Sequence, residues 1–176
     1  MVQSSFTGRR TDLSVLVAGI GNLIMTDDGV GVRIVQHLLD NYRFPKEVEL
    51  LDGGTLGLDL LPRLEGRARL LLVDAVDMDE APGTVLRIAG NDIPMVFSTK
   101  LSPHQMGLQD LLAVAELQGM TFESMVLWGI QPASIDLGVE LSAVVQANFG
   151  TLAHGVLSEL AGWGVDAIAL HQMAGS

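Results

Sequence analysis

Three residues that lie far apart in the chain carry side chains that bind metal ions or move protons. Asp28 follows an apolar run and a glycine-containing turn, Asp74 ends the apolar run 70–73, and His104 follows Pro103. Two carboxylates and one imidazole suit a divalent transition metal. If the strands before these residues run parallel, the side chains converge on one edge of a sheet. The sequence therefore predicts a functional site at Asp28, Asp74 and His104.

The placement of His104 favours a neutral imidazole. Ser102 is expected to be a helix N-cap, Pro103 the first helical residue, and Gln105 the end of a capping box. The positive end of the helix dipole disfavours an imidazolium in the first turn. A neutral ring is the form that binds a metal, although a histidine at the surface or in a polar pocket is the simpler interpretation.

Each aspartate also has a purely structural interpretation. Asp27 or Asp28 can cap the helix that follows, and a helix N-terminus stabilises a carboxylate in either role. Asp74 can be a buried acid that accepts backbone N–H groups. Asp28 and Asp74 could also share a proton as an aspartic dyad, which the sequence neither supports nor excludes.

Two glycine-containing segments add weaker signals. Segment 19–21 begins like a dinucleotide fingerprint, but the third glycine is replaced by Ile24, which disfavours a nucleotide site. Segment 52–55, Asp-Gly-Gly-Thr, is typical of a tight turn, with a role in the wall of a site as the second choice.

Composition excludes several classes of function. The 176-residue chain has 21 acidic and 10 basic residues and a net charge of −11, which disfavours a nucleic-acid partner. It has no cysteine, so thiolate sites and disulfides are absent, and we expect a cytoplasmic location. No apolar run approaches the ~20 residues that span a bilayer, so no membrane insertion is expected.

Apolar runs and helical stripes alternate along the chain, which is typical of an α/β fold. They predict a single domain (1–176) with flexible tails at 1–12 and 170–176. The expected architecture is a three-layer sandwich with a twisted, mostly parallel five-stranded sheet and helices on both faces. The expected strands are 13–18, 48–51, 69–73, 85–88 (antiparallel) and 125–130, and the expected helices are 29–41, 58–63, one from 103, and 141–163; Pro94 is placed in a loop.

Taken together, the segments resemble the hydrogenase maturation endopeptidases, the proteases that process the large subunit of [NiFe]-hydrogenases. The resemblance runs from about residue 13 to residue 168, and the order and spacing of its pieces make it specific. It is carried by Gly19-Ile20-Gly21-Asn22, Asp27-Asp28-Gly29-Val30-Gly31-Val32-Arg33, Asp52-Gly53-Gly54-Thr55, Val73-Asp74-Ala75, Pro82-Gly83-Thr84 and Ser102-Pro103-His104-Gln105.

The resemblance implies a nickel-dependent endopeptidase that removes the C-terminal extension of the large-subunit precursor after nickel insertion. Its metal-contacting and catalytic residues correspond to Asp28, Asp74 and His104. The first position is often glutamate in this family, so Asp28 is a mild departure. Nickel is expected to arrive with the substrate, with another divalent metal as a substitute.

The chemistry of the cleavage step stays open between two routes. The metal can polarise the scissile carbonyl or activate water, or one aspartate can act as the base. A non-catalytic nickel-binding escort of the same precursor is the alternative function, because it would use the same three residues. A nucleotide-binding α/β module is the third.

Overall fold

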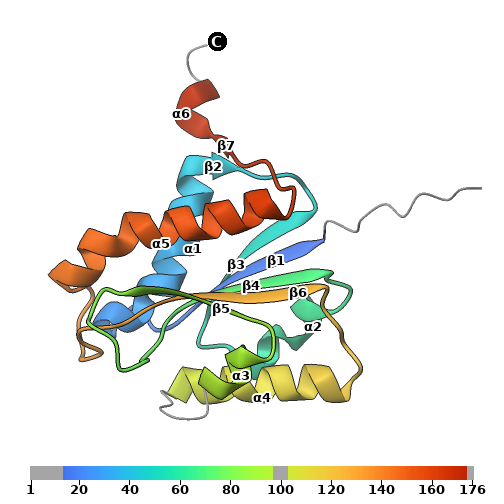
Figure 1. Cartoon of the computed structure of the whole chain (residues 1–176), viewed down its shortest axis with the longest axis horizontal. Coiled ribbons are helices and arrows are strands. Elements are labelled where there is room, and N and C mark those ends of the chain that lie inside the picture. The colour runs from blue at the N-terminus through green and yellow to red at the C-terminus, as the bar shows by residue number, and fades with distance from the viewer. Residues whose placement is uncertain (1–13, 97–102, 174–176) are drawn as a thin grey trace, which may run out of the picture.

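The computed structural model describes residues 14–96 and 103–173, and its centre is a five-stranded sheet between two layers of helices (Figure 1). The strand order is β3-β1-β4-β6-β5, and β5 runs antiparallel to β6 while the other neighbours are parallel. The mostly parallel α/β prediction is therefore confirmed, including the antiparallel strand. The bounds are β1 Val15–Ile20, β3 Val48–Gly54, β4 Arg69–Ala75, β5 Val85–Ala89 and β6 Ser124–Ile130.

Helices cover both faces of this sheet, with α1 and α5 on one side and α2, α3 and α4 on the other (Figure 1). The second side carries the 3-10 turn η2 and the helices α2, α3 and α4. The bounds are α1 Val30–Asn41, α5 Ala143–Gly162, η2 Gly57–Leu60, α2 Leu61–Leu64, α3 Asp92–Val96 and α4 Pro103–Leu117.

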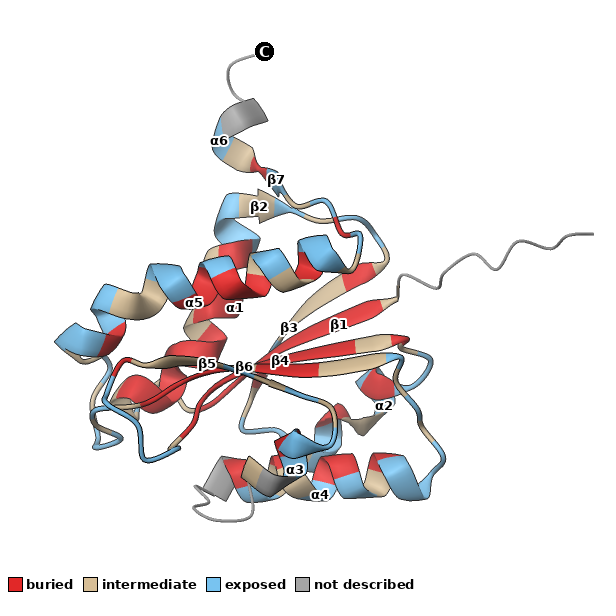
Figure 2. Cartoon of the chain, in the orientation of Figure 1, coloured by how far each residue is buried: buried red, intermediate tan, exposed pale blue. Residues whose placement is uncertain are grey.

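Strand β4 shows how the central strands are buried on both faces, because every residue from Leu70 to Ala75 is buried (red ribbon in Figure 2). Leu71 and Val73 pack in the core under α1 and α5, whereas Leu70 and Leu72 pack in the core under α4. Side chains alternate along a strand, so Asp74 falls on the α4 side of the sheet. An apolar run without visible alternation is thus the signature of a central parallel strand.

The helices bury the apolar stripes that the sequence predicts. In α1, the side chains of Val30, Ile34, Val35 and Leu38 are inaccessible to solvent. In α5 the helix is continuous through its glycines, and Gly155 has a packing role because a Cβ there would lie 2.5 Å from the ring of Trp128. None of the helices within the described ranges is both long and apolar enough to cross a membrane.

Two segments differ from the prediction. The loop expected around Pro94 contains the helix α3, which is too short for a periodic pattern and tolerates proline near its start. The flexible tail expected at 170–176 begins with a helical turn, α6 Leu170–Met173, after strand β7 Ile168–Ala169 pairs with β2 Tyr42–Arg43. The predicted flexible segment 1–12 lies outside the described residues.

Candidate active site

The ends of two neighbouring strands bring Asp28 and Asp74 to the same edge of the sheet. Strands β1 and β4 are parallel, with Gly19 opposite Val73. After β1 the chain turns into the 3-10 helix η1, Thr26–Gly29, which carries Asp28, and Asp74 is the next-to-last residue of β4. This carboxyl edge is where open α/β sheets place their ligands.

Glycines allow η1 and the start of α1 to lie directly on the strand ends. A Cβ on Gly31 would lie 2.0 Å from the carbonyl oxygen of Val73. Gly21 has a φ of +124°, and a Cβ there would lie 1.7 Å from the carbonyl oxygen of Asp28. The glycine-containing turn after β1 is therefore explained by close backbone packing beside the aspartates, without a nucleotide.

Asp28 is buried and is not a helix cap. It is 6 % exposed, and its Oδ2 accepts a hydrogen bond from the backbone N–H of Asn22 at 3.0 Å. The N-cap of α1 is Gly29, and no side chain caps that helix. The capping interpretation of Asp27 and Asp28 is therefore wrong.

Asp74 is fully buried and is held by the first turn of α4. The side-chain amide of Gln105 donates from Nε2 to Asp74 Oδ2 at 3.3 Å and to the carbonyl oxygen of Ala75 at 2.9 Å. These bonds join the start of α4 to the end of β4. Gln105 was expected to complete a capping box with Ser102, and Ser102 lies outside the described residues.

The backbone of His104 is placed at this edge, since it is the second residue of α4 and directly precedes Gln105. Its side chain lies outside the described part of the structure, so the meeting of all three predicted groups stays a prediction. Among the side chains that are described, no three His, Asp or Glu residues form a metal-binding group. Asp28 and Asp74 do not complete a three-residue site by themselves.

Asp27 has a structural role that the sequence did not reveal. Its fully buried carboxylate accepts hydrogen bonds from the backbone N–H groups of Ala133 (2.9 Å), Ser134 (3.1 Å) and Ser142 (2.7 Å). It also accepts the Ser142 hydroxyl at 2.8 Å, and that residue is the N-cap of α5. Asp27 therefore fixes the loop 131–142 against η1, beside Asp28.

Gln131 fixes a second loop at the same edge. It is buried directly after β6; its Oε1 accepts the backbone N–H of Met78 at 2.7 Å and its Nε2 donates to Asp77 Oδ1 at 3.1 Å. The loop that follows Asp74 is thus tied to the loop 131–142. Asp52, the acid of the Asp-Gly-Gly-Thr turn, is exposed at the end of β3, opposite Gly19, which places it in the wall of this edge.

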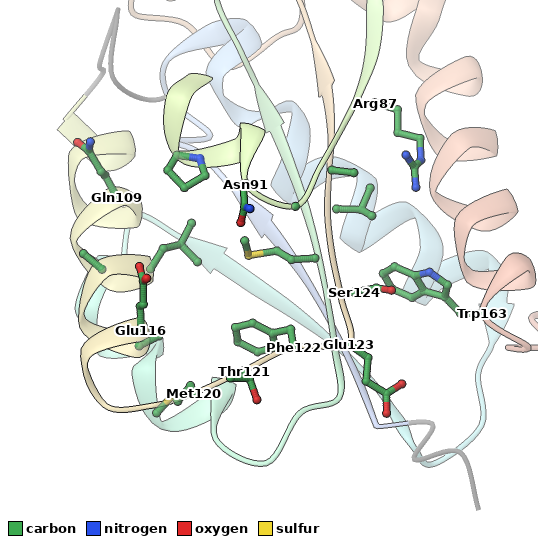
Figure 3. A pocket seen from close by; sticks show the side chains of 18 residues that line it. Arg87, Asn91, Gln109, Glu116, Met120, Thr121, Phe122, Glu123, Ser124 and Trp163 are labelled. Atoms are coloured by element: carbon green, nitrogen blue, oxygen red, sulfur yellow. The ribbon is translucent and has the colours of Figure 1, made fainter.

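A cavity of about 670 Å³ lies elsewhere, between α4 and the amino-terminal half of β6 (Figure 3). Phe122, Glu116 and Trp163 are among its lining residues. Neither Asp28 nor Asp74 is among the residues that line it. This cavity is therefore separate from the two buried aspartates of the candidate site.

Comparison with known proteins identifies the fold and its class of activity. A family model described as hydrogenase maturation protease matches residues 32–159. The chain is 38 % identical over 157 residues to the hydrogenase 2 maturation protease of Escherichia coli, covering 89 % of this chain and 96 % of the relative. It is 40 % identical over 154 residues to the hydrogenase expression/formation protein HupD of Rhodobacter capsulatus, covering 86 % and 73 %.

Solved structures agree with these relatives. The hydrogenase maturating endopeptidase HybD from E. coli superposes with a TM-score of 0.86 at 37 % identity, covering 90 % of this chain and 98 % of that one. The [NiFe] hydrogenase maturation protease HybD from Thermococcus kodakarensis gives 0.67 at 28 % identity, covering 83 % and 98 %. The predicted family, fold and enzyme class are confirmed. The chain belongs to the hydrogenase maturation protease family and is an endopeptidase of that family.

Proposed function

We propose that this endopeptidase removes the C-terminal extension of a [NiFe]-hydrogenase large-subunit precursor once nickel has been inserted. Nickel is then part of the substrate, with another divalent metal as a substitute in vitro. The observation that carries the proposal is the pair of buried carboxylates, Asp28 and Asp74, at one sheet edge beside the helix turn that bears His104. We propose the cytoplasm as the compartment.

The chemistry of the donor set supports a cation as the ligand. Asp28 takes a hydrogen bond from a backbone N–H and Asp74 takes one from a neutral amide. These donors fix the orientation of the two carboxylates at one edge of the sheet. Carboxylates together with an imidazole suit a divalent transition metal.

In this proposal Asp28, Asp74 and His104 contact the nickel that the precursor already holds, so only a loaded precursor is bound productively. The anchored chain presents its scissile peptide beside the two carboxylates. A precursor-bound metal polarises the carbonyl or activates water, or one carboxylate accepts the proton of the attacking water. These two routes share the same residues.

The test is mass measurement of the precursor after incubation with purified protein, with and without nickel loading. We expect loss of the C-terminal peptide from the loaded precursor only, and no loss with His104→Ala that has a wild-type melting temperature. Equal cleavage of nickel-free precursor, or full activity of His104→Ala, would contradict the proposal. A stable complex without any mass change would instead indicate a non-catalytic escort.

A further inference from the structure

Exposed aliphatic side chains gather on the loops around the candidate site. On the loop 131–142, Leu137 is 80 % and Val139 is 64 % exposed, and Ile135 is also exposed. The neighbouring loops and the first turn of α4 add further exposed apolar side chains. These are Ile24, Leu56, Leu58, Met78 and Met106.

Backbone contacts place these side chains around one continuous edge. The backbone N–H of Gly138 donates to the carbonyl of Ile24 at 2.9 Å, which joins the loop 131–142 to the loop after β1. Gly21 N–H donates to Gly54 at 2.9 Å, which joins that loop to the one after β3. A Cβ on Gly57 would lie 3.2 Å from the Cα of Gly107, so Leu56 and Leu58 lie beside the start of α4.

The same loops are acidic. Segments 21–29, 52–60, 76–84 and 131–142 contain no lysine or arginine. One arginine, Arg33 of α1, reaches this edge, where it donates to the carbonyl of Val139; Lys100 lies outside the described residues. Exposed carboxylates stand between the aliphatic side chains, namely Asp52, Asp59, Asp79, Glu80, Asp136 and Glu140.

We propose that this acidic apolar rim is a docking surface for the precursor segment that flanks the scissile bond. The rim surrounds Asp28 and Asp74, so an extended segment that presents its peptide bond to them must cross it. The chemistry of the rim selects an extended segment with aliphatic side chains and with lysine or arginine. This inference rests on the proposed function, because it assigns the substrate contacts of the same site.

The decisive variants are Leu137→Ser and Val139→Ser, with Leu117→Ser as the matched control. Leu117 is 86 % exposed but is the last residue of α4, at the end of that helix remote from Gln105. We expect each rim variant to raise the KM for loaded precursor about tenfold, with a much smaller change in kcat. The control should leave both constants unchanged, and melting temperatures should show that all three variants fold.

The ionic contribution is tested with Glu140→Gln and with salt. We expect the wild-type KM to rise with ionic strength, and the rise to be smaller in Glu140→Gln. Rim variants that match Leu117→Ser in KM, or a wild-type KM independent of salt, would overturn the docking surface.

Direct binding separates this inference from the proposed function. Calorimetry measures the affinity of the wild type and of Leu137→Ser for loaded precursor, whether or not the precursor is cleaved. If Leu137→Ser cleaves the loaded precursor and binds it with wild-type affinity, the docking surface is contradicted and the proposed function stands. If Leu137→Ser binds the precursor more weakly but the wild-type protein does not cleave it, the protease assignment of this site is contradicted and the docking surface is retained.

Discussion

Acidic side chains at the two edges of the sheet have different kinds of partner. At the amino edge, Glu49 is ion-paired with Arg63 at 2.6 Å and also with Arg67, and Arg69 lies 3.3 Å from Glu123. At the carboxyl edge, buried aspartates take their hydrogen bonds from backbone N–H groups, a serine and a glutamine. Among the described contacts, the acids of the amino edge are therefore held by arginines, whereas the buried aspartates of the carboxyl edge are held by backbone and neutral side-chain donors.

Within the carboxyl edge, Asp27 and Asp28 are chain neighbours with different surroundings. Asp27 is enclosed by donors from the loop 131–142, so its oxygens serve the structure. Asp28 accepts a hydrogen bond from the backbone N–H of Asn22, in the turn after β1, and so is held by its own segment of the chain. The two neighbouring acids are therefore held by different parts of the molecule, Asp27 by the distant loop 131–142 and Asp28 by the local turn.

The largest effect is expected from Asp74→Asn. This change removes the charge but keeps an oxygen that can accept the amide of Gln105. We expect the cleavage rate to fall by about a thousandfold or more, with an unchanged melting temperature. Glu49→Gln at the amino edge is the control and should cleave the precursor at the wild-type rate. Equal activity of the two variants would contradict a special role for the acids of the carboxyl edge.

Asp27→Ala should mainly reduce stability. It strips several donors of a buried, charged acceptor, so we expect the free energy of unfolding in urea to fall by about 2–4 kcal/mol. Asp52→Ala removes an exposed acid from the same edge and should change stability by less than about 0.5 kcal/mol. If Asp27→Ala is as stable as the wild type, the loop 131–142 is not fixed by this carboxylate.

Gln105→Met tests the link between α4 and Asp74. The substitution keeps the volume but removes the donor to Asp74 and Ala75, so the carboxylate is less well positioned. We expect kcat to fall about tenfold with a much smaller change in KM. A change in KM alone would show that Gln105 acts in substrate binding and does not position Asp74.

Apart from the control substitutions, the smallest effect is expected for the pair of Arg87 and Glu159. The hydrogen bond from Arg87 lowers the pKa of Glu159, against the opposing effect of burial. A lowered folded-state pKa adds stability above the ordinary carboxyl pKa, and this stability is lost as pH falls through the lowered value. Arg87→Gln should therefore cost at most about 1 kcal/mol near neutral pH and nothing in acid. Thermal melts of the wild type and Arg87→Gln at neutral and acidic pH measure this loss of stability. A stability difference between the two proteins that grows in acid would contradict the prediction.

The sequence was sufficient to predict that Asp28 and Asp74 lie at one edge of the sheet, but not the contacts that hold them there. Their shared position was predictable because parallel strands end at a common edge, and each acid follows a strand-like run. The stripe of Val30, Ile34 and Leu38 was likewise visible as a helical period.

The missed features depend on contacts between distant residues. Asp27 bonds to Ser134, 107 residues away, and Gln131 bonds to Met78, 53 residues away, so neither has a local signature. Gln105 was assigned to its own helix, although its amide nitrogen serves the end of β4. Helix α3 was missed because a five-residue helix shows no period.

The most direct test of the central claim is nickel-edge X-ray absorption of the loaded precursor, frozen immediately after mixing with this protein. We expect oxygen and nitrogen ligands to be added to the nickel on mixing with the wild type, and fewer with Asp74→Asn. A nickel spectrum that the wild-type protein leaves unchanged would contradict the claim that the carboxyl edge contacts the metal.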